Sequence, residues 1–384
     1  MSEVGLSARA RSLVRPEVAG LDPYDPGFVD CAVNLSANES TWPQPAALVG
    51  AVREAVAATP LNRYPDPMAN ALRDELAAWH GVGRDQVVVG NGGDELIFNL
   101  LLAFGGPGRR VLDLPPTFSV YGIYGGLVGS EMVCVPRDPE TFEPRWDETL
   151  EAARTCHVVV LVTPNNPTGN TVSLELVVEL CEACPGVVMV DEAYGEFAPA
   201  SRSAATLLPR YPNLCVLHTL SKAFAMAGAR VGYLLASPEI VDVFAAVRQP
   251  YTVNVLSQAA ALAAVERRDL ALARVAEVVA ERARLTSGLR SLGLRVWDSE
   301  ANFVLVRLPD AHNVRERLAR DFSILVRDLS GAPGLEGCLR VTVGVPEEND
   351  AVLDALATIL SGPLAAALPP QPGNEIKPGA KTGA

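Results

Sequence analysis

The alternation of short apolar runs with helix-forming segments is the feature that most restricts the fold of this chain. Residues 157–162 and 187–190 are two such runs, and residues 174–184 between them have the length and pattern of a helix. Nearly continuous apolar runs are typical of strands that are buried on both faces. The repeated unit predicts an α/β fold in which a mostly parallel, mixed sheet is flanked by helices.

The chain is long enough for one large domain and a smaller one, with 384 residues of which 49% are hydrophobic. We expect an N-terminal arm at residues 1–40, where prolines interrupt regular structure, and a large domain at residues 41–265. Residues 266–362 combine predicted strands and helices into a small α+β C-terminal domain. Residues 363–384 are rich in Pro, Gly and Ala and are predicted to form a disordered tail.

Charge and composition argue against several classes of partner. The formal net charge of −13 disfavours nucleic acid and anionic membranes. The chain contains no apolar run of about 18 residues and no signal-peptide pattern near its start. Its seven cysteines are irregularly spaced and its four histidines are scattered, so no metal site is predicted. We therefore expect a cytoplasmic protein that acts on small molecules.

Lysine is almost absent from this chain. Of the 32 basic residues, only Lys222, Lys377 and Lys381 are lysines, and the last two lie in the predicted tail. An amine can lose its proton and act as a nucleophile, whereas a guanidinium stays charged. Lys222 is therefore a candidate for an imine with an aldehyde such as pyridoxal 5'-phosphate (PLP). A surface lysine left by codon bias is the alternative.

Polar residues follow the ends of several predicted strands, where ligands bind in sheets of this kind. Asn166, Asp191 and Lys222 each lie a few residues beyond an apolar run. The segment at residues 90–95 is a glycine-rich turn between a predicted strand and a helix. Glycines and a helix N-terminus suit a phosphate, although a plain strand–helix turn has the same pattern.

Taken in order, these segments resemble fold-type-I PLP-dependent aminotransferases, and most closely the histidinol-phosphate aminotransferase family. The resemblance covers about residues 12–360. It rests on short segments at residues 38–39, 63–65, 94–95, 115–117, 165–169, 191–194, 219–224, 227–230 and 339–344. It implies a large PLP-binding domain, a small C-terminal domain and a homodimer.

The resemblance also implies roles for the residues at the strand ends. Lys222 would hold PLP and then act as the base that moves the proton, and Asp191 would pair with the pyridine nitrogen. Asn166 and Tyr194 would hydrogen-bond the phenolic oxygen of PLP. The alternatives are a strand-end cap for Asp191 and an ordinary turn for Asn166.

The implied phosphate site takes backbone amides and side chains from three segments. Its expected members are Gly93, Asp94, Thr219, Ser221 and Arg230, together with Tyr64 from the second subunit. A packing role at the interface is the alternative for Tyr64. Many relatives carry tyrosine where this chain has Phe118, which keeps the ring that stacks on the cofactor and loses the hydroxyl. Tyr121 or Tyr124 is a candidate to compensate.

For the substrate, the resemblance assigns Arg340 to an anionic group, and Arg327 suits the extra charge of a phosphomonoester. A surface ion pair is the alternative for Arg327. The other expected substrate-binding residues are Tyr24, Asn38, Tyr251 and Asn302. The implied reaction is transamination between L-histidinol phosphate and 2-oxoglutarate. The alternatives are an aromatic (phenylalanine) aminotransferase, a specialised-metabolism enzyme of the same family, a threonine-phosphate decarboxylase, or a non-catalytic regulator.

Overall fold

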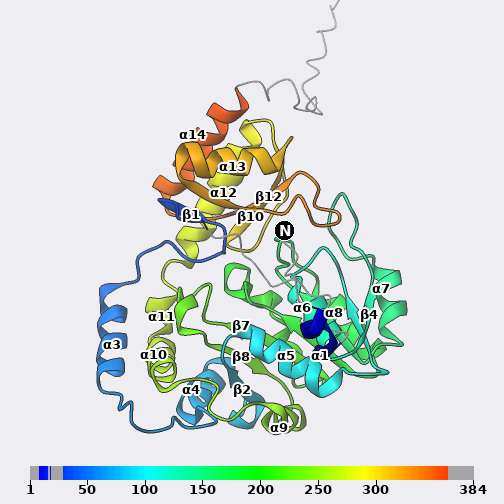
Figure 1. The fold of residues 1–384 in the computed structure, drawn as a ribbon. Helices are drawn as coiled ribbons and strands as arrows, with labels where there is room; N and C mark the ends of the chain where they lie inside the picture. Colours follow the sequence, from blue (N-terminus) through cyan, green and yellow to red (C-terminus); the bar gives the residue numbers. More distant parts are fainter. Residues whose placement is uncertain (1–7, 16–17, 19–28, 362–384) are drawn as a thin grey trace, which may run out of the picture.

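The computed structural model of the chain describes residues 8–15, 18 and 29–361. Tyr24 and the predicted tail at residues 363–384 lie outside the described residues. The described part contains two sheets, each with its own helices (Figure 1). Among these residues, no helix is both long and apolar enough to cross a membrane.

The larger sheet has seven strands. Its five strands β3 to β7 run parallel, whereas β8 is antiparallel to both of its neighbours, β2 and β7. The predicted mostly parallel, mixed sheet is therefore confirmed. In spatial order the strands are β2 (Val87–Gly90), β8 (Gly232–Leu235), β7 (Leu214–Thr219), β6 (Val187–Asp191), β5 (Val158–Val162), β3 (Arg110–Asp113) and β4 (Glu131–Cys134).

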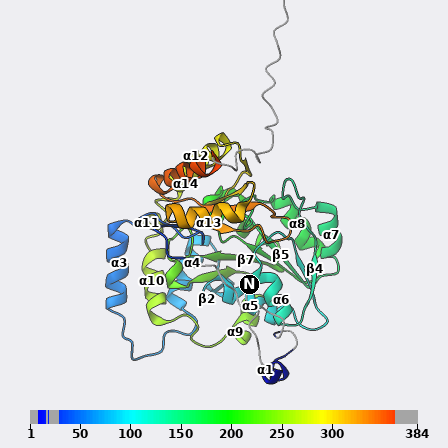
Figure 2. The same ribbon diagram turned by 45° about the horizontal axis from the view of Figure 1, so that its top comes forward.

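Helices cover both faces of this sheet, as the apolar strands require. The central strands β5, β6 and β7 are buried along their whole length. One face packs on α4 (Asn70–His80), α7 (Trp146–Ala153), α8 (Leu174–Ala183) and α10 (Val255–Val265). The other face packs on α5 (Gly93–Phe104), α6 (Val120–Leu127) and α9 (Pro238–Val247). Helix α3 (Ala46–Ala57) lies outside α10, and the two run side by side (Figures 1 and 2).

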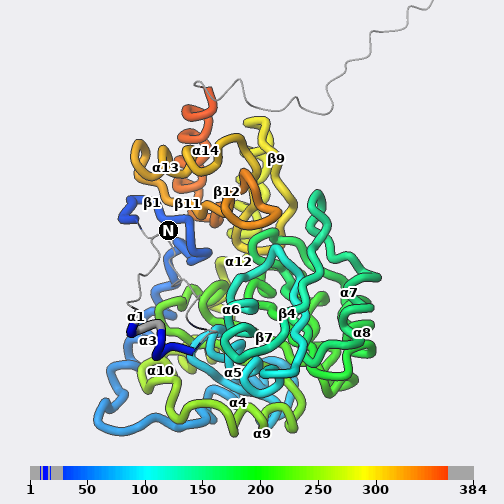
Figure 3. Tube along the Cα trace, turned by 45° about the vertical axis from the view of Figure 1, so that its right-hand side comes forward, coloured from blue at the N-terminus to red at the C-terminus, as the bar shows by residue number. Residues whose placement is uncertain are grey.

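The smaller sheet has five strands and lies above the larger unit (Figures 1 and 3). In spatial order they are β1 (Val33–Leu35), β11 (Ile324–Asp328), β12 (Cys338–Thr342), β10 (Phe303–Arg307) and β9 (Arg295–Val296). Its helices are α12 (Val275–Ser291), α13 (Ala311–Phe322) and α14 (Pro346–Leu360). Strand β1 comes from the segment expected to form the arm and pairs in parallel with β11. The four-part division of the chain stays a prediction.

Short elements complete the described chain. They are α1 (Ala8–Leu13), α11 (Arg268–Ala271) and the 3₁₀ turns η1 (Arg84–Gln86), η2 (Gly195–Phe197), η3 (Ala200–Arg202), η4 (Ala204–Leu207) and η5 (Ala227–Ala229).

A loop from the larger unit fixes the smaller one. The carbonyl of Glu140 accepts hydrogen bonds of 2.7 Å from both Arg295 and Trp297 of the β9 segment. Phe142, two residues further along, is 1% exposed and packs with Leu305 and Leu335 of the smaller unit. Main-chain bonding adds a second link, because Glu300 N donates to Gly169 O over 2.7 Å. The two sheets are thus held at a defined spacing around the cavity between them.

Candidate active site

A cavity of about 420 Å³ lies between the two sheets. The ends of β5, β6 and β7, the start of α5 and strands β11 and β12 all contribute to its wall. Most of the predicted site residues line it: Asn38, Gly93, Asp94, Phe118, Asn166, Asp191, Tyr194, Thr219, Ser221, Lys222, Arg230, Arg327 and Arg340. Residues about 300 positions apart in the chain, such as Asn38 and Arg340, therefore meet in one site.

Three other predicted residues do not line this cavity within a single chain. Tyr64 and Tyr251 stack on each other at the surface, with ring centroids 4.6 Å apart, and are 81% and 42% exposed. Asn302 is buried and its amide donates to Asn38 O over 3.1 Å. It faces a separate cavity of about 10 Å³, which Lys222 also borders. Tyr24 lies outside the described residues.

Lys222 follows β7, and its surroundings lower the pKa of its side-chain amine. Its Nζ donates to Ala37 O over 2.9 Å and lies 5.8 Å from the centre of the Tyr194 ring. Burial lowers the pKa of Lys222 to about 8, and the positive charge of Arg340 acts in the same direction, whereas Glu39 opposes it. Roughly a tenth of the amine is therefore uncharged at pH 7. This is the state in which an amine attacks an aldehyde or accepts a proton.

Asp191 is the last residue of β6 and is 4% exposed. Its Oδ2 accepts a 2.6 Å hydrogen bond from the Tyr121 hydroxyl, and its Oδ1 accepts one of 2.9 Å from Ala193 N. Burial raises the pKa of Asp191 to about 6, while the two hydrogen bonds oppose that rise. The carboxyl group is thus ionised and fixed at neutral pH. It is placed to pair with a cationic group in the cavity.

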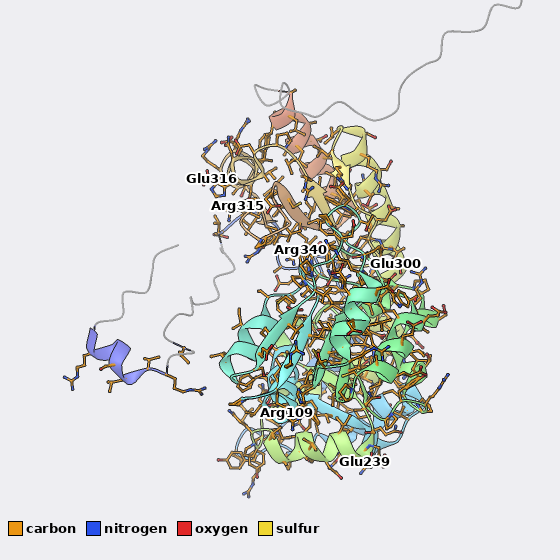
Figure 4. The ribbon with its side chains drawn as sticks, turned by 90° about the vertical axis from the view of Figure 1, so that its right-hand side faces the viewer. Arg109, Glu239, Glu300, Arg315, Glu316 and Arg340 are labelled. Atoms are coloured by element: carbon orange, nitrogen blue, oxygen red, sulfur yellow. The ribbon has the colours of Figure 1, made fainter. Side chains whose placement is uncertain are left out.

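A second set of hydrogen bonds joins the strand ends to the smaller sheet. Arg340 of β12 donates to Asn166 Oδ1 over 2.6 Å and to Ser36 O over 2.7 Å. Asn38 Nδ2 donates to the Tyr194 hydroxyl over 2.8 Å. The guanidinium of Arg340 therefore lies at the junction of the two units, as Figure 4 shows. Its charge can meet an anionic substrate beside Lys222.

The start of α5 forms an anion cradle. The helix begins at Gly93 with no side-chain cap, so its first N–H groups and the positive end of its dipole are available to a ligand. Gly92 precedes it with φ of 84°, and a Cβ there would lie 2.6 Å from Arg230 Nη2. Opposite, the Thr219 and Ser221 hydroxyls are 3.0 Å apart. Backbone and hydroxyl donors with a guanidinium suit a phosphate group.

Sequence reasoning missed two contributors to this site. The sequence suggests Tyr121 only as a substitute for a hydroxyl at Phe118, whereas in the structure its hydroxyl donates to Asp191. The aromatic spacing of three residues at a helix start was the available signal. Gly232 of β8 is the other, because a Cβ there would lie 2.8 Å from both Gly92 C and Gly93 N. Nothing local in the sequence marks that close approach of β8 to the turn before α5.

Comparison with known protein families shows to which family the chain belongs. The family model for aminotransferase class I and II matches residues 31–356. The chain belongs to the class I and II aminotransferase family.

Two curated relatives of this aminotransferase are named histidinol-phosphate aminotransferase. The protein from Frankia casuarinae is 43% identical over 364 residues, covering 91% of this chain and 90% of the relative. The protein from Corynebacterium efficiens is 40% identical over 358 residues, covering 90% and 94%. The histidinol-phosphate aminotransferase of Sinorhizobium meliloti, solved with PLP, superposes with a TM-score of 0.84 at 27% identity, covering 91% and 98%.

The aminotransferase is a PLP-dependent enzyme of fold type I. Its described residues fit that cofactor on three independent grounds. An amine with a lowered pKa stands at Lys222, a buried carboxylate stands at Asp191, and the cradle at Gly92 has no room for a side chain. These are partners for an aldehyde, a pyridinium and a phosphate, respectively.

Proposed function

We propose that this enzyme transfers the amino group of L-histidinol phosphate to 2-oxoglutarate, which yields imidazole acetol phosphate and glutamate, a step of histidine biosynthesis. The observation that carries the substrate assignment is that two arginines besides Arg230, namely Arg327 and Arg340, line the cavity that contains Lys222. A phosphomonoester carries up to two negative charges and three acceptor oxygens, so a second guanidinium is useful. The names of the relatives support the same substrate.

When bound, PLP supplies an aldehyde that captures an amine and a pyridinium ring that withdraws electrons from the reacting carbon. Lys222 is the proposed anchor for the aldehyde. Asp191 lies in the cavity wall as a fixed carboxylate and would keep the ring nitrogen protonated. Asn166 and Tyr194 would hydrogen-bond the phenolic oxygen from the same edge of the sheet.

The proton transfer is assigned to Lys222 Nζ. With a pKa of about 8, the amine can take a proton from the substrate carbon and return one near neutral pH. Its bond to Ala37 O and its position over the Tyr194 ring restrict where the amine can reach. The Ser36 and Asn166 bonds of Arg340 hold the substrate-binding guanidinium in a fixed place beside it.

The cradle at the start of α5 is the proposed site of the cofactor phosphate, with Gly93, Asp94, Thr219, Ser221 and Arg230. Arg230 Nη2 is 3.2 Å from Asp94 Oδ2, and both side chains are half-exposed. This pair holds the guanidinium at the cavity rim, where it can turn one edge toward a phosphate. Phe118 also lines the cavity, and its ring would stack on the cofactor face.

We further propose a homodimer in which Tyr64 reaches the phosphate cradle of the second subunit. Tyr64 and neighbouring Leu61 are 81% and 73% exposed, which is a large apolar area to leave in water. We place the enzyme in the cytoplasm. The seven cysteines are free thiols, as a reducing compartment favours.

The test combines trapping with a substrate panel. Borohydride treatment of the PLP-loaded enzyme, followed by peptide mapping, should label Lys222. With 2-oxoglutarate as acceptor, kcat/KM should be highest for L-histidinol phosphate, lower by at least tenfold for phenylalanine, and lower still for unphosphorylated histidinol. A tenfold preference for phenylalanine would assign the enzyme to aromatic amino acids, and carbon dioxide release from O-phosphothreonine would make it a decarboxylase.

A further inference from the structure

A buried hydrogen bond joins the phenol of Tyr121 to the carboxylate of Asp191 in the cavity wall. Its length of 2.6 Å is typical of an O–H donor on an ionised acceptor. Both side chains are enclosed, with Tyr121 1% exposed and Asp191 4% exposed. Water therefore does not compete for this bond, and the carboxylate is held in one orientation.

The carboxylate of Asp191 keeps bonding capacity beyond its two hydrogen bonds. Asp191 Oδ1 is engaged by Ala193 N and Oδ2 by Tyr121, which uses one lone-pair direction of each oxygen. A carboxylate offers about four such directions. Two are left for a ligand, and Asp191 is itself part of the cavity lining. Tyr121 therefore orients the carboxylate without blocking it.

Tyr121 also supports the aromatic wall of the same cavity. The ring of Phe118 meets the ring of Tyr121 edge-on, with centroids 5.8 Å apart and an interplanar angle of 88°. Phe118 is the residue expected to stack on the cofactor ring. One side chain thus positions both the group expected at the ring nitrogen and the group expected at the ring face.

We propose that Tyr121 is a positioning residue that holds Asp191 as an oriented carboxylate for the pyridine nitrogen and fixes the Phe118 ring. This inference rests on the proposed function, because it takes Asp191 as the partner of the ring nitrogen. The phenol is not assigned a proton-transfer role. Burial and the charge of Asp191 raise the pKa of Tyr121 well above its usual value, so it remains a donor.

Burial and a nearby negative charge favour the protonated form of Asp191, so the hydrogen bond from Tyr121 is needed to keep the carboxylate ionised. Burial is the largest influence on its pKa and favours the neutral acid, and the charge of Asp94 acts in the same direction. Asp113 also faces Tyr121 from β3. The Tyr121 and Ala193 bonds are the influences that favour the ionised form. Loss of the phenol therefore leaves a carboxyl group that protonates at a higher pH.

The test is Tyr121→Phe, which removes the hydroxyl and keeps the ring, with Tyr124→Phe on the same helix as the matched control. Tyr124, the other candidate to compensate at Phe118, is not among the residues that line the cavity and packs edge-on against Phe98, with centroids 5.3 Å apart. Equilibrium dialysis of the apo-protein against PLP across pH 5–8 is the first readout. For Tyr121→Phe the dissociation constant should rise about tenfold at pH 7. The pH below which binding weakens should move up by about one unit. Tyr124→Phe should match wild type within twofold.

A double-mutant cycle separates this effect from general damage. In an Asp191→Asn background, Tyr121→Phe should change PLP affinity by less than twofold, because the bond it removes no longer serves a carboxylate. Thermal melts of the apo-proteins provide the fold check. Equal PLP affinity and pH dependence in Tyr121→Phe and Tyr124→Phe, or additive effects with Asp191→Asn, would overturn the proposal. Failure of the wild-type protein to bind PLP would instead overturn the proposed function.

Discussion

Arg340 of β12 and Asn166, which follows β5, are joined by a 2.6 Å hydrogen bond across the junction of the two sheets. The guanidinium also donates to Ser36 O, so three segments of the chain converge on one cation. A planar guanidinium that already bonds to two acceptors can bind a third, anionic group in a defined direction. This relationship puts Arg340, the proposed substrate-binding cation, at the contact between the two units.

Arg340→Lys tests that geometry. Lysine keeps the charge but cannot span Asn166 and Ser36 while also bonding to a ligand. We expect KM for L-histidinol phosphate to rise about 10- to 100-fold, which corresponds to losing one charge-assisted hydrogen bond. Steady-state kinetics give the answer, with Arg84→Lys at the exposed Asp74 contact as the control. An unchanged KM would mean that Arg340 has a structural role.

The amine of Lys222 should react with a pH dependence set by its lowered pKa. Only the uncharged amine attacks an aldehyde, so the rate of covalent PLP uptake by the apo-protein should rise with pH and level off above about 8. Arg340 is one cause of the lowered pKa, and Arg340→Gln should therefore move the plateau to higher pH. Stopped-flow absorbance measures both rates. A rate that keeps rising toward pH 10 in the wild type would contradict the assignment.

Gly232→Ala should weaken the phosphate cradle without touching any charged group. The added Cβ would lie 2.8 Å from both Gly92 C and Gly93 N, so backbone must shift at the start of α5. Overpacking of this kind costs about 1–3 kcal/mol. We expect PLP affinity to fall by about tenfold or more. Gly50→Ala on α3 is the control, since a Cβ there meets nothing within 4 Å. Titration of apo-protein with PLP compares the two variants.

Local sequence patterns predicted the residues that follow strands and did not predict the pairs they form. Asp191 could be placed because it comes directly after an apolar run, and Lys222 because it lies a few residues beyond one and is the single lysine before the predicted tail. Tyr121 and Asp191 are 70 positions apart, and their contact depends on how α6 lies over β6. The pairing of β1 with β11 depends in the same way on contacts between distant segments. Such contacts arise from tertiary packing, which no short window encodes.

The contacts of the histidines could not be predicted from local sequence either. They are scattered along the sequence, yet His80 and His218 pack with ring centroids 5.1 Å apart beneath the sheet. His218 Nε2 is 3.7 Å from Glu192 Oε2, and its Nδ1 is 3.9 Å from Glu196 Oε1. Tyr233 stacks on His218 at 5.1 Å. Glu192 connects this buried acid–base cluster to Asp191, which precedes it at the end of β6.

Glu196→Gln should flatten the dependence of stability on alkaline pH. Burial raises the pKa of Glu196 to about 8, so the folded protein holds this proton more tightly than the unfolded chain. That contribution is complete below the unfolded pKa of 4.5 and is lost as pH rises through about 8. Burial lowers the pKa of His218, and its opposite contribution is complete above pH 6.5.

From pH 6.5 to 8.5, the wild-type free energy of unfolding should fall by about 2 kcal/mol more than that of Glu196→Gln. Urea titrations of the apo-proteins at several pH values measure this difference. Glu239→Gln changes an exposed carboxylate on α9 (Figure 4) and should behave as wild type. Parallel curves for wild type and Glu196→Gln would show that Glu196 is already ionised at pH 6.5.

The proposed homodimer predicts complementation between two inactive or weakened variants. Tyr64 is 81% exposed in its own chain, whereas Lys222 lines the cavity of that chain. If Tyr64 acts in the partner's site, a mixed dimer of Lys222→Ala and Tyr64→Ala chains contains one site with both residues intact. Random pairing puts half of the chains in mixed dimers, so about one quarter of wild-type sites should be restored.

Co-expression with two different affinity tags isolates the mixed dimer, and its activity with L-histidinol phosphate is compared with that of each parent. Lys222→Ala alone should be inactive, and Tyr64→Ala alone should bind PLP more weakly than wild type. The purified mixed dimer should show about half of wild-type activity per dimer, because one of its two sites carries both substitutions. If it shows no more activity than Tyr64→Ala, then Tyr64 serves its own chain through the stacked pair with Tyr251.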